Sequence, residues 1–170
     1  QKGIYGIKGV PDSMNKLGPR AYAASWVDDH GKLMLWGGAV ADPASAFLQN
    51  DLWSFDPQSK YWTWESGPKN NSRLGEYGKR NYPDLLNWPG GRSKAAAWSS
   101  KDGKLWLMGG IGFDNGAASQ FSGGPLNDLW SFDPQTFLWS WQGGDSISNQ
   151  KSIRGLKGIA SANNKPGAFS

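Results

Sequence analysis

Apolar and aromatic residues alternate with small or polar ones in eight short runs, arranged as two groups of four. The first group is AYAASWV (21–27), KLMLWGG (32–38), DLWSF (51–55) and YWTW (61–64); the second is KAAAWS (94–99), KLWLMGG (104–110), DLWSF (128–132) and FLWSW (137–141). Positions two apart share one face of a strand, so each run predicts a short β-strand. Bulky residues occupy both faces, as at Leu52 and Trp53, which predicts sheets that are covered on both sides.

Turn-forming residues separate these runs. Gly31 follows His30, and Gly103 follows Asp102, where glycine supplies the positive φ of a tight hairpin. Asp56-Pro57 separates the third and fourth runs and recurs as Asp133-Pro134 in the second group; proline presets φ at the second position of a type I turn. Each group therefore predicts one small four-stranded antiparallel sheet.

The two groups are copies of one repeat. NDLWSFDPQ occurs at 50–58 and again at 127–135, and the loop that precedes it is longer in the second copy (111–126) than in the first (39–49). Copying extends into the segments between the sheets, where Gly6, Gly78 and Gly155 align. The final residues, NKPGAFS, match the opening of a further copy.

The double glycine, the Asn-Asp-Leu-Trp stretch and the tryptophan after it resemble the kelch-repeat family, in the long-repeat form of microbial extracellular proteins. The matching residues are Gly37, Gly38, Asn50, Asp51, Trp53 and Trp62 in the first copy, and Gly109, Gly110, Asn127, Asp128, Trp130 and Trp139 in the second. The resemblance implies an all-β fold in which each repeat is one β-propeller blade with its first strand innermost.

The chain departs from the family pattern in repeat length and in the number of repeats. Kelch repeats usually span about 50 residues, and the histidine common in the family's first strand is missing. We expect a connector from a preceding repeat at 1–16, a first blade with its connector at 17–88, a second at 89–165, and the start of a third at 166–170. A propeller needs roughly four to eight blades, so the expected partners are further kelch blades, in a longer chain or in a ring or fibre of copies.

The composition limits the chemistry. There are 11 Trp, 24 Gly and 10 Pro, one His and no Cys, which excludes disulfides, thiolate metal sites and cysteine nucleophiles. We find no Ser-His-Asp set, paired acids or metal-ligand cluster in the sequence, and no apolar run of the roughly 18 residues that a membrane helix needs. The prediction is a chain with no catalytic residues, no metal, no cofactor and no membrane span. The kelch-type copper radical oxidases, by resemblance, require a Tyr–Cys crosslink and histidine ligands that this chain lacks.

Basic residues concentrate between the sheets: 13 of 18 Lys and Arg lie in 1–20, 66–92 and 143–165. Antiparallel strands alternate in direction, so these connectors and the long loops are expected at one end of the sheets. The candidate binding face there comprises Lys79, Arg80, Tyr77, Tyr82, Trp88, Arg20 and Arg92, which would suit an acidic polysaccharide or protein. Two alternatives stand beside it: the connectors lace adjacent blades, and the two arginines form structural ion pairs or carbonyl contacts. Most tryptophans are expected in the core, and His30 in a turn.

Function follows from these expectations. We expect a non-enzymatic structural or interaction scaffold, extracellular or at the cell surface, with no nucleic-acid partner. The alternatives are a carbohydrate- or protein-binding propeller that uses the basic face, and a fragment of a propeller enzyme. Asn70 opens an Asn-Asn-Ser sequon on a predicted exposed connector, so a secreted chain would be a candidate glycoprotein.

Overall fold

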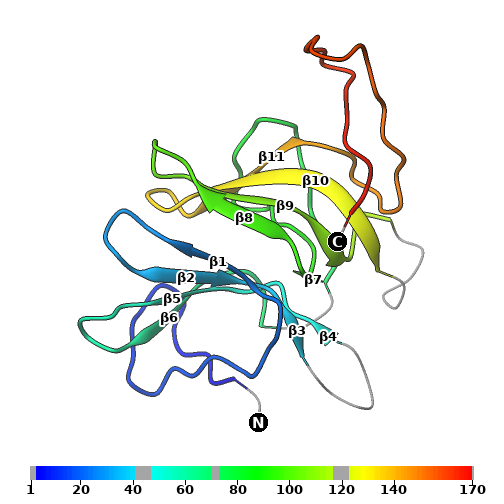
Figure 1. Ribbon diagram of the computed structural model, residues 1–170. Helices are drawn as coiled ribbons and strands as arrows, with labels where there is room; N and C mark the ends of the chain where they lie inside the picture. The colour runs from blue at the N-terminus through cyan, green and yellow to red at the C-terminus, as the bar shows by residue number, and fades with distance from the viewer. Residues whose placement is uncertain (1–2, 41–46, 70–72, 117–122, 170) are drawn as a thin grey trace.

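The computed structural model describes residues 3–40, 47–69, 73–116 and 123–169 (Figure 1). Within these residues the protein is all-β: eleven strands form antiparallel sheets, and no helix occurs. The same residues accordingly include no helix long and apolar enough to cross a membrane.

The first sheet confirms the four strands predicted for the first repeat. Its order is β1 (Ala24–Val27), β2 (Leu33–Trp36), β5 (Leu52–Phe55) and β6 (Trp62–Ser66), with every neighbouring pair antiparallel. Two short strands, β3 (Ala39–Val40) and β4 (Phe47–Leu48), pair with each other in the region predicted as a long loop.

The second sheet repeats this order with longer strands. It comprises β8 (Ala96–Ser99), β9 (Leu105–Gly112), β10 (Gly124–Asp133) and β11 (Leu138–Gly143), and β7 (Arg92–Ser93) also pairs with β9. The prediction of a loop over 111–126 was wrong at both of its ends, because Ile111 pairs with Pro125 and Gly112 with Gly124. The apolar alternation continues there and buries Leu126, but the many glycines conceal it.

The two sheets stack face to face. We call the face that carries Trp26 in the first sheet and Trp98 in the second the A face, and the opposite face, with Trp53 and Trp130, the B face. The A face of the first sheet packs on the B face of the second in one apolar core. Trp36 meets Trp139 with ring centroids 4.8 Å apart, and Trp26 donates its indole N–H to the Trp106 carbonyl at 2.8 Å. The predicted burial of most tryptophans is confirmed, and His30 lies in the expected turn.

The double glycine marks the place where one repeat is tied to the next. Gly37 and Gly38 have φ of 67° and 102°, and a Cβ on Gly37 would lie 2.7 Å from the Arg92 carbonyl oxygen. The Arg92 carbonyl accepts from the Gly38 N–H at 2.8 Å, and the Arg92 N–H donates to Gln49 at 3.3 Å. Only glycine combines this backbone conformation with so close an approach. Phe169 makes the equivalent two bonds at the end of the second sheet.

Three segments that flank the sheets in the sequence share one compact shape, and we call them the first (3–16), second (75–88) and third (152–165) lobes. Each is closed by a pair of backbone hydrogen bonds between its ends, for example Ile4 with Lys16 and Ile153 with Lys165. The first lobe packs on β6 and the second on β11, whereas the third extends away from both sheets (Figure 1). Each packed lobe thus covers the sheet that follows it, while the sequence-based boundaries grouped 75–88 with the sheet before it.

Candidate functional site: a buried ion-pair cluster

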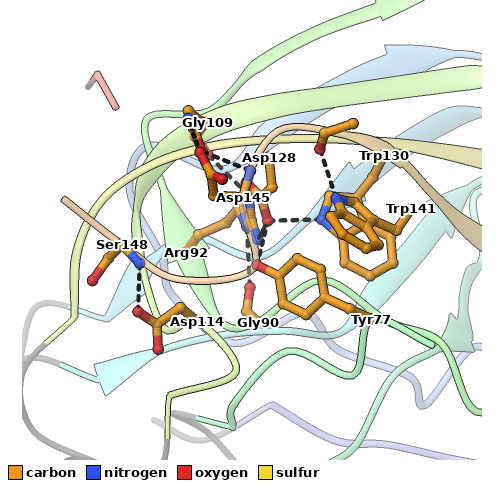
Figure 2. Close-up of polar contacts among 12 residues, drawn as sticks. Tyr77, Gly90, Arg92, Gly109, Asp114, Asp128, Trp130, Trp141, Asp145 and Ser148 are labelled. Carbon is orange, nitrogen blue, oxygen red and sulfur yellow. Dashed lines mark hydrogen bonds and ion pairs between the residues drawn. The ribbon is translucent and has the colours of Figure 1, made fainter. Parts of the chain in front are cut away.

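The most elaborate polar arrangement in the second repeat surrounds Asp128 (Figure 2). Arg92 makes a two-pronged ion pair with it, Nη1 to Oδ1 at 2.6 Å and Nη2 to Oδ2 at 2.7 Å. Asp128 also accepts from the Tyr77 hydroxyl at 2.7 Å and from the Trp130 indole N–H at 2.8 Å. The relative exposure is 0% for Asp128, 1% for Arg92 and 3% for Tyr77, so the whole cluster is shielded from water.

Three segments far apart in sequence bring these groups together. Arg92 opens β7, Tyr77 comes from the second lobe, and Asp128 lies in β10 where the pairing with β9 shifts register between Leu126 and Leu129. The bulge removes Asp128 from the regular ladder. Carbonyls of Gly90 and Gly109 accept further bonds from the guanidinium, at 3.2 and 3.1 Å. The carboxylate therefore accepts four hydrogen bonds, one at Oδ1 and three at Oδ2, and nearly every guanidinium donor is in use.

The surroundings of the cluster raise the pKa values of both Tyr77 and Arg92. Burial raises the pKa of the Tyr77 hydroxyl, and the Asp128 charge raises it further, so Tyr77 stays a hydrogen-bond donor. Burial by itself would lower the pKa of Arg92, but the Asp128 carboxylate outweighs it and the net shift is upward. The upward pKa shifts keep Arg92 charged and Tyr77 a neutral donor, and both side chains bond to Asp128, an arrangement suited to holding segments together.

The first repeat contains the same cluster. Arg20 pairs with Asp51 at 2.6 and 3.0 Å, and Asp51 accepts from the Trp53 indole at 2.6 Å and from the Tyr5 hydroxyl. Arg20 also donates to the Gly37 carbonyl at 3.0 Å. Burial and the Asp51 charge raise the pKa of Tyr5, as at Tyr77.

These contacts correct part of the predicted binding face. Arg20, Arg92 and Tyr77 are not available to a ligand, because their polar groups are turned inward and committed to Asp51 or Asp128. The alternative prediction for the arginines, a structural ion pair with carbonyl contacts, is confirmed.

The other members of that face remain at or near the surface. Lys79 and Tyr82 are exposed, and Trp88 is half-buried with its indole N–H donating to Leu74 at 3.2 Å. Arg80 is exposed but lies over the Trp141 ring, 5.4 Å from its centroid, and donates to the Gln142 carbonyl at 3.0 Å. This arginine fastens the second lobe to β11, which agrees with the alternative that the connectors lace the sheets. Asn70 lies outside the described residues.

The residues that carry the resemblance to the kelch family lie at structural positions, buried or in the bonds between repeats. The two double glycines tie the repeats, as described above. The motif's Asn-Asp pairs are almost fully buried, with exposures of 0–1%; Trp53, Trp130 and Trp139 are buried, and Trp62 is half-buried. Asn127 donates to Asp145 at 2.9 Å and to the Pro166 carbonyl at 3.0 Å, so this motif residue holds the base of the third lobe.

The sequence analysis named Tyr77 as a member of the binding face and did not name Tyr5, so it missed the part that both tyrosines play in the clusters. Tyr5 and Tyr77 each precede one of the aligned glycines, so their recurrence was visible, but nothing in the spacing indicated that they would reach an aspartate some 50 positions later. The lobe asparagines were also missed: Asn15 and Asn87 are buried at 4% and 5% and bond to edge-strand carbonyls.

Acidic residues gather at the end of the sheets that carries the short hairpin turns, opposite the double glycines. A cavity between the hairpin turns of the two repeats is lined in part by Asp28, Asp29, Asp102 and Asp133. No set of three or more His, Cys, Asp or Glu in the described part of the chain is placed to hold a metal ion.

Comparison with known proteins gives a limited result. No family model matches the chain, and no curated protein matches it. Among solved structures that match, the one described as "Structure of YjhT" shares 21% sequence identity, covers 75% of this chain and has a TM-score of 0.49. The chain spans 39% of that chain's length.

Proposed function

We propose that this chain is a non-enzymatic structural and interaction scaffold built from kelch-type β-propeller blades, and that it acts outside the cell or at its surface. The observation that carries the proposal is the repetition of one buried Arg–Asp–Tyr–Trp cluster in two sheets that stack face to face. The charged groups of each cluster bond to other segments of the same chain. This arrangement suits a protein whose task is to present a rigid, extendable array.

The uncovered A face of the second sheet supports stacking of further repeats. Trp26 on the A face of the first sheet is 5% exposed, because the second sheet covers it. Its counterpart Trp98 is 42% exposed and stacks on Trp106 with ring centroids 6.1 Å apart. An apolar aromatic surface of this kind marks an interaction site, and the matching surface is another B face. The proposed partners are therefore further kelch blades.

The exposed side chains of the second lobe favour a second candidate function, binding of an acidic polysaccharide or protein. Lys79 and Tyr82 offer a cation and an aromatic ring on one lobe, both open to solvent. A glycan array with the wild type and a Lys79→Ala, Tyr82→Ala variant tests this. Salt-sensitive binding that the variant loses supports it, and no binding to acidic sugars rejects it.

The scaffold is tested with a chain extended after Ser170 by a further copy of residues 22–67, because Ser170 occupies the position of Ala21 in the repeat. Stacking of the added sheet should bury Trp98. Acrylamide quenching of tryptophan fluorescence, with Trp98→Phe forms of both chains to isolate its signal, measures this. A fall in Trp98 accessibility is expected in the extended chain. If Trp98 stays as accessible as in the 170-residue chain, the scaffold proposal fails.

A further inference from the structure

The third lobe has the internal fold of the two packed lobes but lies on no sheet. Ile153 and Lys165 exchange backbone hydrogen bonds of 2.9 Å, as the ends of the other lobes do. Gly155 lies against the Asn164 side chain, where a Cβ would be 2.5 Å from its Oδ1, and Gly6 and Gly78 show the same contact with their own asparagines. The lobe therefore keeps its shape without a sheet beneath it.

Three donors fix a packed lobe to its sheet. In the first lobe, the Gly9 N–H donates to the Trp64 carbonyl at 2.8 Å, the Asp12 N–H to Trp62 at 3.4 Å, and the Asn15 side-chain amide to Trp62 at 2.8 Å. The second lobe repeats all three bonds on β11, at 2.8, 3.3 and 3.3 Å. Both lobes thus bond to the outer strand of the following sheet.

The same three donors in the third lobe reach no strand among the described residues. They are the N–H groups of Gly158 and Ser161 and the side-chain amide of Asn164. Asn164 is exposed, whereas Asn15 and Asn87 are 4% and 5% exposed. The groups that bind an edge strand are assembled here and open to solvent.

In and just after the third lobe, the aromatic residue and the arginine of the ion-pair cluster have exchanged positions. Arg154 stands where the first repeat has Tyr5, and Phe169 stands where it has Arg20. Both of those positions face one carboxylate in the first repeat, that of Asp51. After this exchange, one aromatic side chain and one cation would still lie beside the aspartate carboxylate. Arg154 is exposed and pairs with no acidic side chain in the described ranges.

We propose that the third lobe, with Arg154 and Phe169, is a docking element for the outer strand of a further four-stranded sheet of this repeat, and that Arg154 is the cation that pairs with the buried aspartate of that sheet. The occupant is a sheet that follows the lobe in the same polypeptide, because both packed lobes cover the sheet that follows them. A second copy of the chain does not fit, since its β6 and β11 already carry lobes. The inference rests on the proposed scaffold and names how the next repeat is recognised.

A double-mutant cycle around Asp51 tests the exchange in the existing chain. Arg20→Phe removes the cation that pairs with the buried Asp51 carboxylate, and Tyr5→Arg alone places a second guanidinium beside that carboxylate. The combined variant reproduces the arrangement of the third lobe. We expect it to regain at least half of the urea-midpoint loss caused by Arg20→Phe. Regaining less than half overturns the exchange.

The chain extended with residues 22–67 tests docking directly. Hydrogen exchange of the Gly158 and Ser161 amides should slow at least tenfold relative to the 170-residue chain. Arg154→Ala should lower the urea midpoint of the extended chain and leave that of the 170-residue chain unchanged. Unchanged exchange, or equal effects of Arg154→Ala in both chains, overturns the proposal. So does concentration-dependent protection of these amides in the 170-residue chain, which would identify a second copy as the occupant.

The two proposals fail in different ways. Burial of Trp98 in the extended chain with an unprotected third lobe leaves the scaffold standing and rejects the docking role. A Trp98 that stays exposed rejects the scaffold itself, whatever the double-mutant cycle shows.

Discussion

The clusters around Asp51 and Asp128 make the same hydrogen bonds in different surroundings. Each aspartate receives an arginine, a tyrosine and a tryptophan from its own repeat. Tyr77 is 3% exposed, because it belongs to the apolar core between the two sheets, whereas Tyr5 is half-buried at the open B face of the first sheet. The neighbouring repeat thus lowers the solvent exposure of the cluster around Asp128 but does not change its hydrogen bonds.

This difference identifies the structural unit of the protein. A lobe and the sheet that follows it contain all the partners of one cluster, so the unit is complete before any stacking occurs. Stacking then affects the contacts whose solvent exposure it changes, above all the tyrosine hydrogen bond, since a bond to a charged group costs more to break in a dry environment than near water. The predictions below test the separation between contacts made within a unit and burial supplied by its neighbour.

Removal of the buried carboxylate should have the largest effect. Asp128→Ala leaves the Arg92 guanidinium buried without a counter-ion, and breaking a buried pair in this way costs about 3–5 kcal/mol. Asp51→Ala should cost less, because water can approach beside the half-buried Tyr5, although the Arg20 and Asp51 side chains are themselves only 3% and 0% exposed. Urea denaturation gives both free energies of unfolding. Replacing both partners, Arg92→Met with Asp128→Leu, is the control and should recover much of the loss; equal costs at Asp51 and Asp128 would contradict the role of the neighbouring repeat.

Replacing the glycine that follows the last strand of each sheet should lower the free energy of unfolding equally in the two units. Gly67 and Gly144 have φ of 82° and 76°, and a Cβ on either would lie 2.1 Å from a backbone carbonyl oxygen. Alanine at either position adds this clash to the left-handed conformation, so we expect a loss of more than about 2 kcal/mol in the free energy of unfolding. Because both contacts lie within a unit, the two losses should agree.

Gly9 provides the matched control for these glycines. Its φ is 75°, but no atom lies within 4 Å of a built Cβ. Gly9→Ala should therefore cost only the conformational term, about 1 kcal/mol. A loss at Gly9 as large as that at Gly67 would show that conformation, and not the close approach to Asn50, determines the effect.

The tyrosine hydroxyls give a more graded comparison. Tyr77→Phe removes one donor from a fully buried carboxylate, and hydrogen bonds to charged groups contribute about 1.5–3 kcal/mol. Tyr5→Phe should cost less, since water can reach the half-buried position of Tyr5 and replace the lost donor. Thermal unfolding of the two variants and of the exposed control Tyr82→Phe measures the difference. A larger loss for Tyr5→Phe would refute the ranking by burial.

The smallest effect is expected where the two units differ in charge. Glu65 of the first unit is buried and accepts from Ser54 at 2.6 Å, while Gln142 holds the equivalent position and donates to Ser131 at 2.9 Å. Burial raises the pKa of Glu65 above its ordinary value of 4.5, and the Ser54 hydrogen bond offsets only part of that rise. The folded state then holds this proton more tightly than the unfolded chain does. Stability should therefore fall as pH increases from about 4.5 through the raised pKa.

Glu65→Gln should remove this pH dependence and increase stability at pH 7, where the buried Glu65 carboxyl group would otherwise be charged. Urea titrations between pH 4 and pH 8 measure it. The reciprocal change Gln142→Glu should introduce a similar fall with pH in the second unit. If Glu65→Gln destabilises the protein at pH 7, the carboxylate contributes more through Ser54 than burial takes away.

The strands and turns were predictable because their signals are local. Alternation at Met34 and Trp36, glycine at 31 and the Asp-Pro turns each act over a few residues, and the strands formed where expected. The burial of Arg92 and Tyr77 was not predictable in the same way. It depends on a lobe that folds forward onto the next sheet, and basic residues in a glycine-rich connector look solvent-exposed until that packing is known.

The backbone hydrogen bonds that tie one repeat to the next at the double glycine affect how such a chain can change in length. Arg92 and Phe169 each complete the sheet before them, so a cut between repeats leaves a sheet without these bonds, a lobe without its sheet, or both. Genetic recombination between the two identical NDLWSFDPQ stretches avoids this, because it joins the front of one third strand to the back of the other. A whole unit is gained or lost with every lobe still followed by its sheet. The protein's length can therefore change in steps of one repeat without a new junction having to be invented.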